Sequence, residues 1–195
     1  MLRWKRVEIS GSFLLLAAGL YYLDSGGILP WALAACGLHE LGHYLAIRLL
    51  GGQVSLLRLT CVGAEMRLSA RFPLGPGRQI LTALAGPVTN LLLALVLGRR
   101  AARLGAELWL FAGLNLTLGA FNLLPVAQLD GGRIVQNLLI LLGAGEIAER
   151  AIQWASLILA GTLAVAGSLL LLQGKVNGTL PLTALWLLLS QLKPL

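Results

Sequence analysis

Six long apolar stretches dominate this sequence and limit the folds that are open to it. They run over residues 7–23, 27–50, 80–97, 108–124, 152–172 and 176–192. A helix needs about 20 mostly apolar residues to cross a bilayer, and each stretch comes close to that length. Since 57% of the 195 residues are hydrophobic, a soluble domain could not bury this much apolar surface. The sequence therefore predicts an all-α integral membrane protein with about six transmembrane helices.

Residues 53–69 interrupt the helical pattern between the second and third stretches. Apolar and polar residues partly alternate there, with Gly63 near the middle, which favours a short β-hairpin over a helix. A hairpin cannot leave its edges open to lipid, so we expect it at the membrane interface or re-entrant against the helices. An edge strand in this place could receive an extended peptide by strand addition.

The basic residues lie mainly in the short segments between the apolar stretches. With the N-terminus in the cytosol, most Arg and Lys residues fall on the inner side, which favours an N-in, C-in topology by the positive-inside rule. Arg99, Arg100 and Arg103 fall on the outer side and oppose this assignment. The net charge of +7 thus fits orientation against a lipid bilayer, and it does not suggest a nucleic-acid partner.

The two histidines of the chain, His39 and His43, both lie in the HELGH segment of the second stretch. Residues four apart share one face of a helix, so both imidazoles can reach a single metal ion. Glu40 can serve as general base for a metal-bound water, as in the H-E-x-x-H pattern. The alternative is a chance match with imidazoles bonded to helix backbones. Because polar groups are expensive in an apolar helix, we favour the metal site.

A hydrolytic zinc site usually has three protein ligands and one open position, so a third ligand is needed. Most acidic residues flank the apolar stretches or lie in loops, which leaves Asp130 in the segment FNLLPVAQLDGG at 121–132. Pro125 would end the fourth helix just before it. An ionised Asp at membrane depth costs about 2.5–3.5 kcal/mol, which a bound cation would offset. In the alternative, Asp130 caps a helix that begins after Gly132.

HELGH in an early membrane helix, with NLLPVAQLDGG in a later one, resembles the site-2 protease family of intramembrane zinc metalloproteases. The six-span plan resembles its prokaryotic members, and most of all the branch of stage IV sporulation protein FB. AGPVTN at Ala85–Asn90 also resembles a family segment. The resemblance implies one zinc ion per chain, with His39, His43 and Asp130 as ligands. It also implies that Glu40 is the catalytic base.

Four further residues are candidates to bind the substrate or the oxyanion: Asn122, Pro125, Gly86 and Asn90. The resemblance implies a site-lining role for Asn122, whereas a kinked helix explains the group around Gly86 and Asn90 equally well. We expect a single intramembrane metalloprotease domain over 1–195. Sporulation-type members commonly carry a C-terminal CBS domain, but we expect no CBS or PDZ domain in this chain.

The resemblance implies cleavage of membrane-embedded or membrane-associated substrates in a bacterial cell membrane, with the site towards the cytosolic side. Regulated intramembrane proteolysis of a pro-sigma or anti-sigma factor would fit, as would a role in sporulation or control by a membrane regulator. One alternative is a metal-ion transporter, which would need further polar residues at similar depth on several helices. The other is a catalytically inactive membrane scaffold, in which HELGH or LDGG should carry substitutions. Both motifs are intact.

Overall fold

The structure is a computed structural model that describes residues 2–4, 7–60, 63–173 and 185. The chain divides into two compact units, Met1–Asn122 and Leu123–Leu195. The first unit holds four helices and a four-stranded sheet, and the second holds two helices within the described residues.

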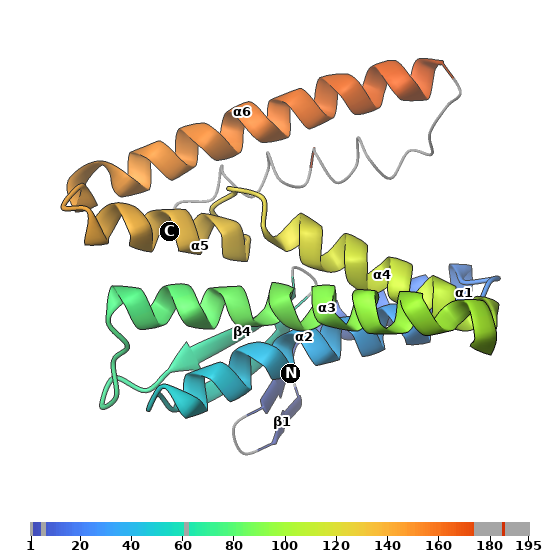
Figure 1. The fold of residues 1–195 in the computed structure, drawn as a ribbon, viewed down its shortest axis with the longest axis horizontal. Helices are drawn as coiled ribbons and strands as arrows, with labels where there is room; N and C mark the ends of the chain where they lie inside the picture. Colours follow the sequence, from blue (N-terminus) through green and yellow to red (C-terminus); the bar gives the residue numbers. More distant parts are fainter. Residues whose placement is uncertain (1, 5–6, 61–62, 174–184, 186–195) are drawn as a thin grey trace. The chain divides into compact units, whose positions relative to one another are not determined.

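The first unit is built around its third helix. Its helices are α1 (Gly11–Leu23), α2 (Leu29–Leu49), α3 (Pro76–Leu104) and α4 (Ala106–Asn122). Helix α3 packs against both α2 and α4 (Figure 1). Small residues allow this close approach: a Cβ atom added to Gly42 of α2 would lie 2.8 Å from the Ala85 carbonyl oxygen. One added to Gly119 of α4 would lie 3.1 Å from the Pro87 carbonyl oxygen. The three helices are thus held in contact through glycines.

Asp24 fixes the tight turn between α1 and α2. Its carboxylate oxygens accept hydrogen bonds from the Ile28 and Leu29 N–H groups at 2.9 and 2.8 Å. These N–H groups form the positive end of α2, where a negative charge is stabilising. The hydrogen bonds from Leu29 and then Ile28 hold the pKa of the Asp24 carboxyl below its ordinary value. The carboxylate therefore takes the place of a conventional N-cap.

The sheet joins the start of the chain to the segment after α2. Its strands are β1 (Leu2–Trp4), β2 (Val7–Ile9), β3 (Val54–Thr60) and β4 (Gly63–Leu68), in the order β1-β2-β3-β4. The outer pairs are antiparallel, whereas β2 and β3 are parallel. Glu8 faces Arg58 in this register, and their side chains form an ion pair at 3.0 Å. Ile47, Val54 and Leu74 form a small apolar core that packs the sheet against the end of α2.

The second unit contains α5 (Asp130–Leu141) and α6 (Gly145–Leu172), which pack against each other. A short connection joins them, in which Gly143 has a φ of 79°. This left-handed conformation is open to glycine without strain, so the chain can reverse within three residues. Helix α5 is a separate short helix that the six-span scheme leaves out.

The predicted helices are confirmed at most positions, but the all-α class is wrong in one respect. The apolar stretch 7–23 does not start as a helix, because residues 7–9 form β2 and pair with β3. The predicted hairpin at 53–69 is confirmed as β3 and β4, within a larger sheet. The predicted span 176–192 lies outside the described residues, apart from residue 185.

Two described helical segments are long and apolar enough to cross a membrane, Pro76–Arg100 within α3 and the whole of α6. The other helices fall short of the roughly 20 residues of a full span or carry polar groups. Helices α1 and α4 have 13 and 17 residues, and α2 contains the HELGH segment. Six complete spans are therefore not seen within the described part of the chain.

Candidate metal centre

HELGH forms the middle of α2 and brings the two imidazoles together. His39 is buried, and His43 and Glu40 are half-buried. The two imidazole rings are nearly perpendicular, with an interplanar angle of 82°, and their centroids lie 4.6 Å apart. Their Nε2 atoms approach to 3.0 Å. The spacing of four residues thus places both rings on one face of the helix, as predicted.

The other nitrogen of each imidazole is held by α3. His39 Nδ1 contacts the Asn90 Oδ1 atom, and His43 Nδ1 lies 2.7 Å from the Thr82 carbonyl oxygen. Both oxygens accept hydrogen bonds, so each Nδ1 carries the proton and donates. Each Nε2 atom then presents its lone pair to the same region. This arrangement of the second nitrogen is typical of metal-binding histidines.

The histidine pair fits a zinc ion. Two imidazole nitrogens bound tetrahedrally at about 2.0–2.1 Å from zinc lie about 3.3 Å apart. The observed Nε2–Nε2 separation of 3.0 Å is within a few tenths of an ångström of this value. A cation bound by both atoms would also remove the repulsion between two nitrogen lone pairs that face each other at this distance.

Gly86 of α3 leaves the space that the imidazoles occupy. A Cβ atom added there would lie 2.8 Å from His39 Nε2, and it would also collide with Nε2 and Cε1 of His43. No side chain larger than hydrogen fits without moving both rings. Gly86 therefore has a clear steric function, which the sequence alone did not show.

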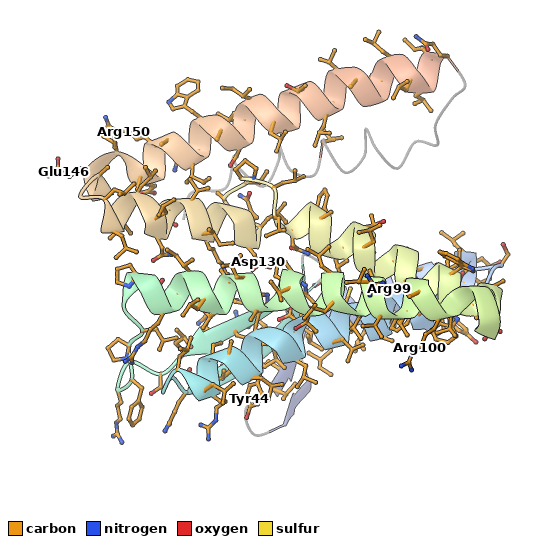
Figure 2. The ribbon with its side chains drawn as sticks, viewed as in Figure 1. Tyr44, Arg99, Arg100, Asp130, Glu146 and Arg150 are labelled. Atoms are coloured by element: carbon orange, nitrogen blue, oxygen red, sulfur yellow. The ribbon has the colours of Figure 1, made fainter. Side chains whose placement is uncertain are left out.

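Asp130 lies in the second unit, at the first residue of α5, and Figure 2 labels it there. Its side chain is buried, and the α5 N-terminus places positive dipole charge beside it. The alternative of a cap before a helix that starts after Gly132 is wrong, because Asp130 is itself helical. A buried carboxylate in this position is a suitable hard ligand for a metal ion.

The backbone folds tightly around Asp130 because of the two glycines that follow it. Cβ atoms added to Gly131 or Gly132 would collide with the backbone carbonyl groups of the loop 123–129. Helix α6 secures the same loop, since the Ala127 N–H donates to the buried Ser156 Oγ at 2.8 Å. The LDGG run is therefore needed for the local fold as well as for its carboxylate.

The other site candidates have distinct places. Asn90 is fully buried and contacts His39, so it orients a histidine, which differs from the substrate-binding role expected for it. Asn122 is the last residue of α4, and its Nδ2 donates to the Leu118 carbonyl oxygen at 3.0 Å. Pro125 is exposed in the loop after α4. For Asn122 and Pro125, contact with a substrate stays a prediction.

Comparisons with known proteins find a peptidase family and zinc metalloproteases that are similar to parts of this chain. Residues 98–166 match the model of the family described as Peptidase family M50. The chain is 35% identical over 128 residues to the "Putative zinc metalloprotease Rip3" of Mycobacterium tuberculosis, an alignment that covers 61% of this chain and 32% of that protein. It is 29% identical over 108 residues to the "Zinc metalloprotease MJ0392" of Methanocaldococcus jannaschii, covering 52% of this chain and 31% of that protein. The chain thus spans about a third of the length of the curated relatives it matches.

The fold resembles that of a solved structure, the site-2 protease of Methanocaldococcus jannaschii. The TM-score is 0.64 and the identity 22%, and the alignment covers 98% of this chain and 92% of that chain. At this identity the likeness concerns the fold. The chain is thus similar to peptidase family M50 over residues 98–166, to zinc metalloproteases in sequence and to a site-2 protease in fold.

Proposed function

We propose that this chain is a membrane-embedded zinc metalloendopeptidase of the site-2 protease type. The observation that carries the proposal is the pair of Nε2 atoms, 3.0 Å apart, on a helix that presents Glu40 directly after the first histidine. Both rings are fixed through Nδ1 by α3, so the lone pairs are directed before any metal arrives. A pair of histidines that served only as packing would not need this arrangement.

Asp130 is proposed as the third zinc ligand. Catalytic zinc sites usually combine three protein ligands with one open position, and the histidine pair supplies two of them. Asp130 is buried, and a buried carboxylate is stable only when it is paired or binds a metal ion. In this proposal Asp130 of the second unit and the histidine pair of the first unit bind the same zinc ion.

In this proposal Glu40 is the catalytic base. A zinc ion held by these residues supplies Lewis-acid chemistry, which lowers the pKa of water and polarises a peptide carbonyl. The Glu40 carboxylate takes the proton from the attacking water and later donates it to the leaving amine. The Glu40 side chain is half-buried, so it can reach water while its neighbour His39 stays enclosed. Asn122 is proposed to contact the substrate carbonyl.

The substrate is proposed to be a membrane-embedded or membrane-associated polypeptide. Two helices in the described part of the chain are long and apolar enough to span a bilayer. Strand β4 is the last strand of the sheet among the described residues, and its outer edge could hold an extended peptide by strand addition. Pro-sigma and anti-sigma factors are candidate substrates, and the N-in, C-in topology would place the site towards the cytosol. Kinship with the sporulation branch is part of the same proposal.

The test is cleavage of co-expressed single-span substrates, with zinc content measured on the same purified proteins. Glu40→Gln should retain zinc and lose the cleavage product, because the amide keeps the shape of the side chain but cannot accept a proton. Asp130→Ala should lose zinc as well as cleavage. Glu107→Gln, the same change at an exposed position on α4, should match the wild type. Cleavage by the Glu40 variant would refute the proposed base, and unchanged zinc in the Asp130 variant would remove it from the ligand set.

A further inference from the structure

Two asparagines are fully buried in the first unit, Asn90 on α3 and Asn115 on α4. A buried amide is costly unless its donor and acceptor groups are bonded. Asn90 Nδ2 donates to Asn115 Oδ1 at 2.7 Å, and Asn115 Nδ2 donates to the Phe111 carbonyl oxygen at 2.8 Å. Asn90 Oδ1 contacts His39 Nδ1. These contacts form one chain of hydrogen bonds from α4 through α3 to the metal-binding face of α2.

This chain of hydrogen bonds has a fixed direction. The Phe111 carbonyl oxygen can only accept, so Asn115 must turn its NH2 group towards it. That leaves Asn115 Oδ1 facing Asn90, which must in turn present its own NH2 group. The Ala35 carbonyl oxygen, 3.2 Å from Asn90 Nδ2, requires the same orientation. Asn90 therefore turns Oδ1 towards His39.

An acceptor facing His39 Nδ1 selects one tautomer of the imidazole. With the proton on Nδ1, the lone pair is on Nε2, the atom that faces His43. His43 reaches the same state by a simpler route, because the Thr82 backbone carbonyl cannot reverse its role. A side-chain amide can flip by 180° and present a donor in place of an acceptor. Asn90 therefore needs the support that its partners provide.

We propose that Asn115 is a positioning residue, which acts through Asn90 to hold His39 in the tautomer that binds the metal. The proposal rests on the zinc site proposed for this chain and adds a residue on a third helix. Asn115 lies on α4, and its amide sets the orientation of the Asn90 amide that touches His39. In a buried hydrogen-bond network of this kind, removing one member weakens the interactions of the others.

The test compares Asn115→Leu with Asn137→Leu in detergent-solubilised, full-length protein. Asn137 is also buried and helical, and its Nδ2 donates to the Arg133 carbonyl oxygen of its own helix. Competitive zinc titration should show about tenfold weaker binding for the Asn115 variant, the lower end of the range for residues that orient a ligating histidine. The Asn137 variant should bind zinc within about twofold of the wild type.

A second variant and a double variant distinguish a positioning role of Asn115 from a general loss of folding. Asn115→Asp has the same shape, and its protonated form can donate to Phe111 and accept from Asn90, so zinc binding should be restored. In an Asn90→Ala background, Asn115→Leu should cause no further loss of affinity, because its route to His39 is already broken. Additive losses would overturn the proposal.

The tautomer itself can be observed in the metal-free protein by ¹⁵N NMR of labelled histidine, since the chain contains only two histidines. The wild type should show His39 protonated on Nδ1, and Asn115→Leu should populate the other tautomer. A wild-type His39 protonated on Nε2 would refute the proposed role of Asn115, even if every variant failed to fold. Failure of the wild type to bind zinc would instead refute the proposed function, so the two failures are distinguishable.

Discussion

Replacing Gly86 by alanine adds a single methyl group at a position that has no free space for it. The new Cβ would lie 2.8 Å from His39 Nε2, and a carbon–nitrogen contact settles at about 3.5 Å. The ring would have to move by about 0.7 Å, whereas metal–ligand distances tolerate about 0.2 Å. His43 is crowded by the same methyl group. Both ligands on α2 would therefore lose their geometry together.

This substitution should affect metal binding far more than folding. Alanine is a better helix former than glycine by up to about 1 kcal/mol, although Pro87 offsets part of this gain at the position before it. Overpacking against the two rings offsets the rest of this gain, so the metal-free protein should unfold at a temperature similar to that of the wild type. Zinc affinity should fall about 10- to 100-fold, as for the loss of a residue that orients a ligand. That range corresponds to about 1.4–2.7 kcal/mol.

Gly98 offers a matched control on the same helix, because a Cβ atom added there meets nothing within 4 Å. Gly98→Ala should raise stability without changing zinc affinity. The assays are thermal unfolding in the presence of a chelator and competitive zinc titration of each variant. Equal zinc affinity for the two alanine variants would refute the steric reasoning at Gly86. A large loss of metal-free stability in Gly86→Ala would show that the glycine serves packing instead.

Two further predictions concern the first unit outside the metal centre. Arg58→Leu should lower the free energy of unfolding by about 3 kcal/mol, because it removes a cation that is ion-paired with the buried Glu8 carboxylate. Arg67→Leu, which removes an exposed ion pair, should cost less than about 1 kcal/mol in the same denaturant titration. The carboxyl of Asp24 has a lowered pKa, so its stabilisation of α2 should be complete above the ordinary pKa of 3.8 and lost as the pH falls through the lower folded value. Amide exchange at the start of α2 should show this loss in the wild type, and Asp24→Asn should remove the pH dependence.

The parts of the fold that depend on local pattern could be predicted from the sequence. Apolar runs of suitable length predicted α2 and α4 within a few residues, and alternation with a central Gly63 predicted the β3–β4 hairpin. Strand β2 was missed because it has only three residues and its partner lies about 50 residues further along the chain. Such non-local pairing leaves no periodic signal in a short segment.

The site divides in the same way. The spacing of His39 and His43 reveals a shared face because helix geometry is universal. The functions of Gly86, Asn90 and Asn115 depend on how closely α3 approaches α2 and α4, which no single segment records. The signal available in the sequence was the occurrence of small and amide residues inside apolar helices, where polar side chains are costly. This signal indicates that such a residue has a function, but it does not identify the side chain that the residue contacts.

The parallel pairing of β2 with β3 has a consequence for biogenesis. During synthesis residues 7–9 leave the ribosome well before residues 57–59, so β2 can pair only with β1 until β3 is made. In that interval α1 and α2 are completed, and the late pairing then ties both ends of this helical hairpin together. A nascent chain halted before residue 54 would leave one edge of β2 without its partner strand, open to proteolytic quality control.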